Sequence, residues 1–303
     1  MERRHGRVAD GQSQARNLSQ ADASAPVKAS APVGVFDSGI GGLTVAHAIG
    51  ERLPLERIHY FGDTAHMPYG ERSPALVRRY AVRIARHLVD KGCKALVIAC
   101  NTASANALDA VREEVGDRVP VLDVVAPVVA RVVASGAERI GVVGTRATIT
   151  SGLYGQLLRQ AFAAGGRNSD THDVREFATP LLAPLIEEGW HTNDIIEPII
   201  RGYLERAGFA AGDLDALILG CTHYPLASAS FSKVLGGGTH MLDAPEAVAE
   251  ALAEVLRNHG LASEDQRGEH RFEVSDLTPS FSASAELFFG TGLKLQPFDL
   301  WAD

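Results

Sequence analysis

Short aliphatic runs alternate with longer amphipathic segments along this chain from residue 32 onward. The runs predict strands over residues 33–37, 58–62, 95–99, 119–123, 139–144 and 216–219. The intervening segments predict helices over residues 43–52, 149–162, 181–188 and 195–207, and further helices that begin near Pro74, Pro127 and Pro245. Aliphatic runs of four or five residues between helices are typical of parallel strands buried on both faces. The alternation therefore predicts an α/β fold with mostly parallel sheets.

Two of these strands lead into a cysteine that is closely followed by a threonine. The strand over residues 95–99 is followed by Cys100 and Thr102, and the strand over residues 216–219 is followed by Cys221 and Thr222. Ligands of open α/β sheets bind beyond the carboxyl ends of the strands. Two thiols that face one carbon from opposite sides can remove a proton from one face and return one to the other. This is the chemistry of a cofactor-free racemase.

The two halves of the chain repeat this pattern in outline. Each half has an earlier strand that ends in a polar loop, near Asp37 and near Thr145, and a later strand that ends in a cysteine. The repetition predicts two similar doubly wound α/β domains with the active site in the cleft between them. A coincidence between common strand–turn patterns is the alternative.

Residues 34–42 combine a strand, a glycine-rich turn and the start of a helix. Such a turn presents backbone N–H groups to an anion. It is not a Walker loop, and it does not fit G-x-G-x-x-G because Thr44 occupies the last position. Asp37 would repel a phosphate but could face an ammonium group, while Ser38 and the backbone amides face a carboxylate. The turn therefore suits a zwitterion, and a plain strand–helix connection is the alternative.

The cysteines could also have roles other than acid/base catalysis. Both Cys100 and Cys221 lie where a predicted strand gives way to a helix, a position that shifts a thiol toward the thiolate. Buried structural cysteine is the usual alternative, and we assign Cys93 to it. A zinc site with Cys221, His223 and His240 competes, although the chain has neither C-x-x-C nor H-E-x-x-H. A pyridoxal phosphate racemase would need a Schiff-base lysine, and no lysine lies in a motif of that kind.

Composition excludes several classes of function. A net charge of -8 without a dominant basic stripe argues against nucleic-acid binding. Three cysteines are too few for a disulfide scaffold and fit a reducing, cytoplasmic setting. No apolar run approaches the ~18 residues of a membrane span. Residues 1–31 lack the apolar segment of a secretory signal and predict a disordered tail.

Taken together, these motifs resemble the glutamate racemases of the aspartate/glutamate racemase superfamily. The likeness spans residues 33–290 and is carried by residues 34–45, 60–64, 68–70, 100–104, 144–149 and 220–226. Two departures are modest. His66-Met67 replaces what is often an Arg followed by a small apolar residue, and Ala126 replaces the acid that commonly precedes Pro127.

The resemblance implies an isomerase that interconverts L- and D-glutamate by 1,1-proton transfer, needs no cofactor or metal, and supplies D-glutamate for peptidoglycan. Cys100 would act on the D-enantiomer and Cys221 on the L-enantiomer, assisted by Asp37, Glu187 and His223. The implied substrate-binding residues are Asp37, Ser38, Tyr69, Gly70, Asn101, Thr102, Thr222 and His223, with Thr145 and Thr148 nearby. Without the resemblance, Glu187 reads as a solvent-facing acid and residues 68–70 as a structural turn.

The resemblance also implies that the C-terminal segment returns to complete the first domain. The expected domains are residues 32–124 plus 243–303, and residues 125–242. A homodimer is compatible with this family. Two alternatives stay open: an aspartate or hydantoin racemase with the same pair of thiols, and a non-catalytic amino-acid-binding protein on the same scaffold. The presence of both thiols argues against the latter, because binding alone requires neither.

Overall fold

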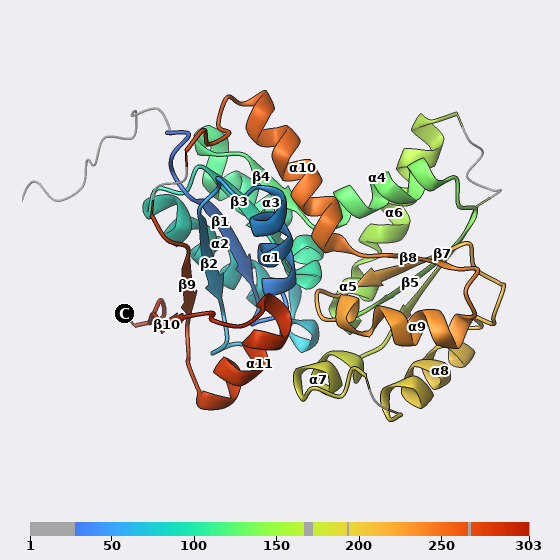
Figure 1. Ribbon diagram of the computed structural model, residues 1–303. Coiled ribbons are helices and arrows are strands. Elements are labelled where there is room, and N and C mark those ends of the chain that lie inside the picture. The colour runs from blue at the N-terminus through green and yellow to red at the C-terminus, as the bar shows by residue number, and fades with distance from the viewer. Residues whose placement is uncertain (1–27, 167–171, 193, 266–267, 303) are drawn as a thin grey trace, which may run out of the picture.

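Two parallel β-sheets lie side by side, and helices flank both of them (Figure 1). The computed structural model describes residues 28–166, 172–192, 194–265 and 268–302. Every strand pairing in it is parallel. The predicted α/β class with two doubly wound, parallel units is therefore confirmed. Within these ranges, each helix is too short or too polar to cross a bilayer.

The first sheet has six strands in the order β10-β9-β2-β1-β3-β4. These strands are β1 (Val33–Asp37), β2 (Ile58–Gly62), β3 (Ala95–Ile98), β4 (Val121–Asp123), β9 (Arg271–Val274) and β10 (Leu295–Pro297). The second sheet has four strands in the order β6-β5-β7-β8. These are β5 (Arg139–Gly144), β6 (Asp173–Ala178), β7 (Ala216–Gly220) and β8 (His240–Leu242).

Helices follow most strands. Those that accompany the first sheet are α1 (Leu43–Arg52), α2 (Pro74–Asp90), α3 (Asn101–Val115), α10 (Ala244–Asn258) and α11 (Pro279–Phe289). Those that accompany the second sheet are α4 (Val125–Ser135), α5 (Arg146–Ser151), α6 (Leu153–Ala164), α7 (Leu182–Glu187), α8 (Ile196–Arg206) and α9 (Ser228–Leu235). Short 3-10 helices cover Tyr69–Glu71, Gly116–Arg118 and Tyr224–Ala227.

The central strands of the first sheet are mainly apolar because both of their faces are covered. Val33 and Val35 of β1 belong to the apolar cluster that includes residues of α1 and α10. Phe36 belongs to the cluster that includes residues of α2 and α3, and in β3 Val97 and Ile98 alternate in the same way. A period of two on a sheet covered on both sides gives a continuous aliphatic run. This is the signal that made these strands predictable.

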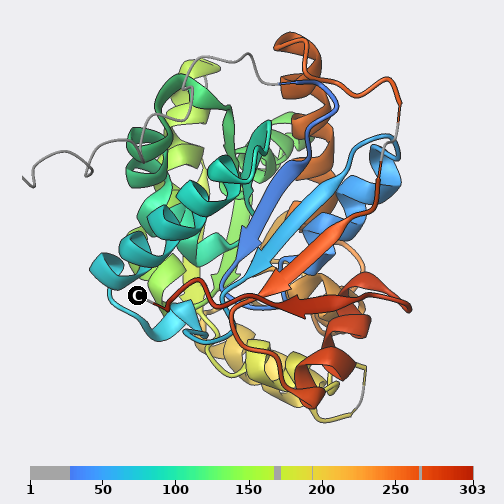
Figure 2. The ribbon, with the colours of Figure 1, turned by 90° about the vertical axis from the view of Figure 1, so that its left-hand side faces the viewer.

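The C-terminal part of the chain returns to the first sheet after the second sheet is complete. Figure 2 shows β9 and β10, in orange and red, beside β2 in blue. His59 of β2 pairs with Arg271 of β9, and Phe272 of β9 pairs with Leu295 of β10. The expected domain boundaries at residues 124 and 242 stay a prediction.

Several predicted boundaries were wrong. β4 begins at Val121 rather than at residue 119, after Pro120, which has no backbone N–H for a ladder. α4 begins at Val125, two residues before Pro127, and Asp123 Oδ1 accepts two of its first N–H groups, those of Val125 at 2.7 Å and Ala126 at 2.9 Å, which have no acceptor within the helix. The single helix predicted over residues 149–162 is two helices, α5 and α6, separated by Gly152 with φ of 65°.

Most of the predicted N-terminal tail, residues 1–27, lies outside the described residues. The predicted tail ends at residue 31, and its last four residues, 28–31, are described and contact the rest of the protein. The carbonyl oxygen of Ala29 accepts a hydrogen bond from Ser263 Oγ at 2.8 Å. The carbonyl oxygen of Ser30 accepts one from Arg57 at 2.6 Å.

Candidate active site

A cavity of about 170 Å³ lies where the carboxyl ends of strands from both sheets meet. All the site residues expected from the sequence line it: Asp37, Ser38, Tyr69, Gly70, Cys100, Asn101, Thr102, Glu187, Cys221, Thr222 and His223. Gly39, Met67, Pro68, Thr145, Ala183 and Pro184 complete the lining. Cys93 is buried but does not line this cavity. The two cysteines that follow β3 and β7 therefore line the same cavity.

Cys100 caps the N-terminus of α3. Its Sγ accepts the backbone N–H of Ala103 at 3.4 Å, and it lies 3.7 Å from Ser38 Oγ. Burial raises the pKa of the Cys100 thiol, and the charge of Asp37 raises it further, against the lowering effect of the Ala103 amide. The predicted shift of this cysteine toward the thiolate is therefore wrong. Cys100 favours the protonated thiol.

Asp37 is the last residue of β1 and is almost fully buried. Its Oδ2 accepts backbone hydrogen bonds from Gly42 at 2.9 Å and from Gly39 at 3.3 Å. Burial raises the pKa of Asp37, although the nearby His223 and the Gly42 amide oppose this. The glycine-rich turn was expected to offer backbone amides to a substrate carboxylate, but two of them have Asp37 as their acceptor.

Cys221, His223 and Glu187 form a connected chain on the opposite wall. Cys221 Sγ lies 3.5 Å from His223 Nδ1, and His223 Nε2 lies 2.6 Å from Glu187 Oε1. Burial lowers the pKa of His223, but the charges of Cys221 and Glu187 and their hydrogen bonds outweigh burial and raise it well above its usual value. This wall therefore favours an imidazolium next to the sulfur atom.

The local structure after β7 differs from the expectation. Cys221 was predicted to lie at the start of a helix, as Cys100 does. A turn and the 3-10 helix Tyr224–Ala227 follow it instead, and α9 begins only at Ser228. His240, the third member of the alternative zinc site, is an exposed residue of β8 and does not line the cavity.

Asn101 has a fixed orientation in the cavity wall. Its Oδ1 accepts the hydroxyl of Tyr154, from α6, at 2.6 Å. Its Nδ2 is buried and has no hydrogen-bond partner among the described residues. A buried donor without a partner costs free energy. Asn101 thus offers a donor that a bound ligand can satisfy.

Three threonine hydroxyls join the two sheets beside the cavity. Thr102 Oγ1 lies 2.9 Å from Thr145 Oγ1 and 3.2 Å from Thr148 Oγ1, and the latter two are 3.0 Å apart. Thr148 does not line the cavity itself. Near the other wall, Thr44 Oγ1 donates to the carbonyl oxygen of Thr222 at 3.1 Å. These hydrogen bonds connect the wall that carries Cys100 to the wall that carries Cys221.

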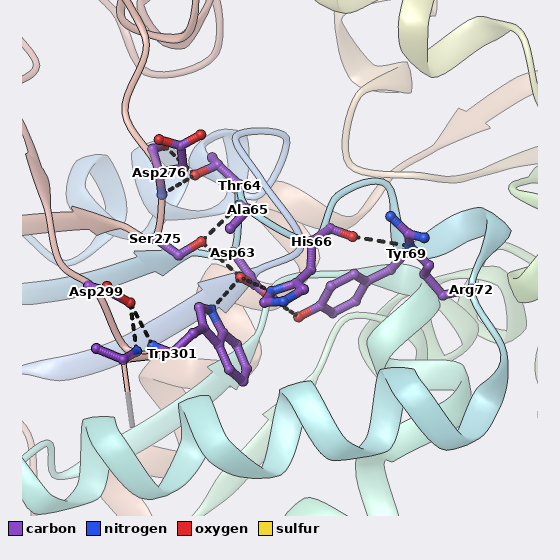
Figure 3. A network of polar contacts seen from close by, with 11 residues as sticks. Asp63, Thr64, Ala65, His66, Tyr69, Arg72, Ser275, Asp276, Asp299 and Trp301 are labelled. Atoms are coloured by element: carbon purple, nitrogen blue, oxygen red, sulfur yellow. Dashed lines mark hydrogen bonds and ion pairs between the residues drawn. The ribbon is translucent and has the colours of Figure 1, made fainter.

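Two residues that line the cavity, Tyr69 and Gly70, are positioned by contacts with neighbouring residues. The Tyr69 hydroxyl donates to Asp63 Oδ2 at 2.6 Å (Figure 3). Gly70 lies so close to Thr145 that a Cβ built on it would be 2.8 Å from the threonine Cβ. Residues 68–70 therefore form part of the site. The sequence pattern alone had indicated only a turn.

One group of described residues has spacing suited to a metal ion: His59, His87 and Glu273. Both imidazole Nε2 atoms lie near the same oxygen, Glu273 Oε2, at 2.8 and 3.1 Å. These are hydrogen-bond distances, and none of the three residues lines the cavity. The group joins β2, α2 and β9 in the interior of the first sheet.

Comparison with known proteins adds independent evidence. The family model described as Asp/Glu/Hydantoin racemase matches residues 44–252. A glutamate racemase of Geobacter metallireducens is 40% identical over 260 residues, which cover 85% of this chain and 92% of the relative. A glutamate racemase of Thermus thermophilus is 42% identical over 256 residues, covering 84% and 91%. The structure of a glutamate racemase of Francisella tularensis in complex with D-glutamate aligns with a TM-score of 0.82 and 35% identity, covering 90% of this chain and 99% of the other.

Proposed function

Because the chain belongs to the Asp/Glu/Hydantoin racemase family, we propose that it is a glutamate racemase whose two acid/base groups are Cys100 and Cys221. The observation that carries this proposal is that both sulfur-bearing residues line one cavity, each from a different sheet. The names of the relatives support glutamate as the substrate.

The two sulfur atoms have different surroundings. Cys100 is buried beside Asp37, and both effects favour its thiol. Cys221 Sγ lies 3.5 Å from Nδ1 of His223, whose raised pKa favours an imidazolium. A two-base racemase that binds L-glutamate needs a thiol at Cys100 and a thiolate at Cys221.

In this state the Cys221 thiolate removes the α-proton of L-glutamate, so that the Cα–H bond breaks and an S–H bond forms. The electron pair left on Cα delocalises into the α-carboxylate. The Cys100 thiol then gives its proton to the opposite face of Cα and becomes the thiolate. The product is D-glutamate, and the reverse direction begins from the exchanged protonation states. Asp37 and His223 lie beside the two sulfurs and can return the protons to their starting places.

The charge that develops on the α-carboxylate needs fixed donors. The unpartnered Nδ2 of Asn101 is such a donor, and Thr102 and Thr222 line the same cavity. Removing one donor of this kind typically costs about 3–4 kcal/mol of transition-state stabilisation. Ser38, Tyr69 and Gly70 complete the proposed substrate contacts.

We propose that the two cysteine-bearing walls move with two domains, residues 32–124 plus 243–303 and residues 125–242. All strands of the first sheet come from the former ranges and all strands of the second from the latter. Closure of the cavity excludes water and strengthens the electrostatic contacts inside it. The biological role that fits is supply of D-glutamate for peptidoglycan in the cytoplasm.

The proposal is tested by following the circular dichroism of L- and D-glutamate without added cofactor. Wild type should racemise both, and Cys100→Ala and Cys221→Ala should each lose nearly all activity. The matched control is Cys93→Ala, which removes the third thiol and should retain activity. Activity that survives either Cys100→Ala or Cys221→Ala would contradict the mechanism. Chiral chromatography with aspartate and hydantoins in place of glutamate distinguishes the related racemases.

Isotope exchange distinguishes a two-base mechanism from a one-base mechanism. In D2O, thiols exchange their protons with solvent, and each thiol serves one face of Cα. The product enantiomer should therefore carry deuterium at Cα from the first turnovers, while recovered substrate stays protonated. Equal deuteration of substrate and product at low conversion would indicate a single base.

A further inference from the structure

Asp63, directly after β2, is a buried carboxylate that accepts hydrogen bonds from four side chains (Figure 3). Its Oδ1 accepts from His66 Nδ1 at 2.9 Å, from Ser275 Oγ at 2.8 Å and from Trp301 Nε1 at 2.9 Å. Its Oδ2 accepts the Tyr69 hydroxyl at 2.6 Å. One carboxylate thus connects the end of the chain with a residue that lines the catalytic cavity.

The indole of Trp301 is fixed by more than this hydrogen bond. Its ring meets the His66 ring edge to face at 4.5 Å and the Tyr80 ring at 5.3 Å. The Arg83 guanidinium lies 5.0 Å from the centre of the indole. Contacts of this kind orient an aromatic ring as well as burying it. The N–H of Trp301 is therefore directed at Asp63.

The backbone around Trp301 is also ordered. Asp299 Oδ1 accepts the backbone N–H groups of Trp301 at 3.0 Å and of Ala302 at 2.8 Å. Phe298 N donates to the carbonyl oxygen of Val274 at 2.9 Å, so the segment continues from β10 along the edge of the first sheet. The last described residues thus form a strap from this edge to Asp63.

We propose that Trp301 is a positioning residue for racemisation, which holds Tyr69 against the substrate cavity through their common acceptor Asp63. This inference rests on the proposed function, because it requires glutamate to bind in the cavity that Tyr69 lines.

The hydrogen bonds of Asp63 link Trp301 to the cavity residues Tyr69 and Asp37. Burial raises the pKa of Tyr69, and the charge of Asp63 raises it further, so the hydroxyl stays protonated and donates to the carboxylate. The backbone N–H of Asp63 donates to the carbonyl oxygen of Asp37 at 3.0 Å. Trp301 does not line the cavity. Its influence on the site passes through Asp63.

The alternative is that Trp301 only anchors the end of the chain. A simple anchor affects stability, but it leaves substrate affinity unchanged at temperatures where the protein is folded. A positioning residue changes KM, because Tyr69 contacts bound substrate before and during reaction. Loss of uniform binding raises KM with little change in kcat.

The first test is Trp301→Phe, which keeps an aromatic ring and removes the N–H donor. A hydrogen bond to a carboxylate is strong enough that we expect KM for glutamate to rise about five- to tenfold, with kcat within about twofold. The matched control is Trp190→Phe, the same substitution at the other tryptophan, whose side chain is exposed. It should change neither constant. Trp301→His, which keeps a ring N–H, should raise KM less than Trp301→Phe.

The second test combines Trp301→Phe with Tyr69→Phe. If Trp301 acts through the Tyr69 hydroxyl, the double variant should resemble Tyr69→Phe alone, with less than about a twofold further rise in KM. Fully multiplicative effects would overturn the proposal, as would an unchanged KM in both Trp301 variants. Loss of folding in Trp301→Phe leaves Trp301→His to decide. Failure of the proposed function is recognised separately, because wild type would then not racemise glutamate at all.

Discussion

The carboxylate of Glu187 lies 2.6 Å from Nε2 of His223, on the side of the ring away from Cys221. Glu187 is the last residue of α7, and His223 comes two residues after Cys221. A carboxylate in this place fixes the orientation of the ring and stabilises its protonated form. The acid/base state of the Cys221 wall should therefore depend on Glu187.

We predict that Glu187→Gln moves the alkaline limb of the kcat/KM profile to lower pH. Glu187 contributes to the raised pKa of His223, so its neutralisation lowers that pKa and the imidazolium is lost earlier as pH rises. Loss of the oriented partner should also reduce kcat roughly a hundredfold. The measurement is the pH dependence of racemisation, with Glu188→Gln, an exposed neighbour, as control. An alkaline limb that stays in place would contradict the assignment.

The second prediction concerns the close approach of the two walls at Gly41. A Cβ on this residue would lie 2.4 Å from His223 Cε1 and 2.6 Å from Thr222 Oγ1. Gly41→Ala should therefore displace His223 and lower kcat/KM by about a hundredfold or more, because small displacements at a reacting site are costly. Steady-state kinetics with both enantiomers checks this.

Gly50→Ala is the matched control for Gly41→Ala. Gly50 lies inside α1, and a Cβ there would meet only Ile58 Cδ1, at 3.9 Å. Alanine in a helix interior stabilises by about 1 kcal/mol relative to glycine, so this variant should be fully active and slightly more stable. Equal losses of activity in the two glycine variants would show that the effect does not arise from contact with His223.

The sequence predicts the helices and strands that are marked by a local pattern of apolar residues. β1, β2 and β5 have the predicted bounds because most of their residues are apolar and nearly all of them are buried. The short strand β8 has an exposed first residue and no aliphatic run, so no pattern marked it. The break between α5 and α6 depends on one residue, Gly152, in a left-handed conformation, and glycine is compatible with either outcome.

The candidate site also combines features that the sequence predicted with features that depend on tertiary contacts. The strand ends that carry Cys100 and Cys221 were recognisable, and the family resemblance supplied Glu187. The protonation preference of Cys100 was not predictable, because it depends on burial and on the distance to Asp37. The contact between Asp63 and Trp301 joins residues 238 positions apart, and no local pattern specifies it. Contacts of this kind arise only when the C-terminal strands return to the first sheet.

Glu273 of β9 is the group that ties this returning segment to the interior. Its Oε2 accepts from His59 of β2 at 2.8 Å and from His87 of α2 at 3.1 Å. Burial alone would raise the pKa of Glu273, but the hydrogen bonds from His59 and His87 prevail and hold it below its usual value. The buried carboxylate is thus ionised in the folded protein.

The last prediction follows from the sign of that shift. A carboxyl whose pKa is lower in the folded than in the unfolded chain contributes stability above its unfolded pKa of about 4.3, and that contribution is lost as pH falls. Glu273→Gln should lower the free energy of unfolding by about 2–3 kcal/mol at neutral pH, and the difference from wild type should shrink below about pH 4. Urea unfolding at several pH values measures this, with exposed Glu286→Gln on α11 as control. A difference that is constant from neutral to acidic pH would mean that the charge of Glu273 does not stabilise the fold, and that its hydrogen bonds act through geometry alone.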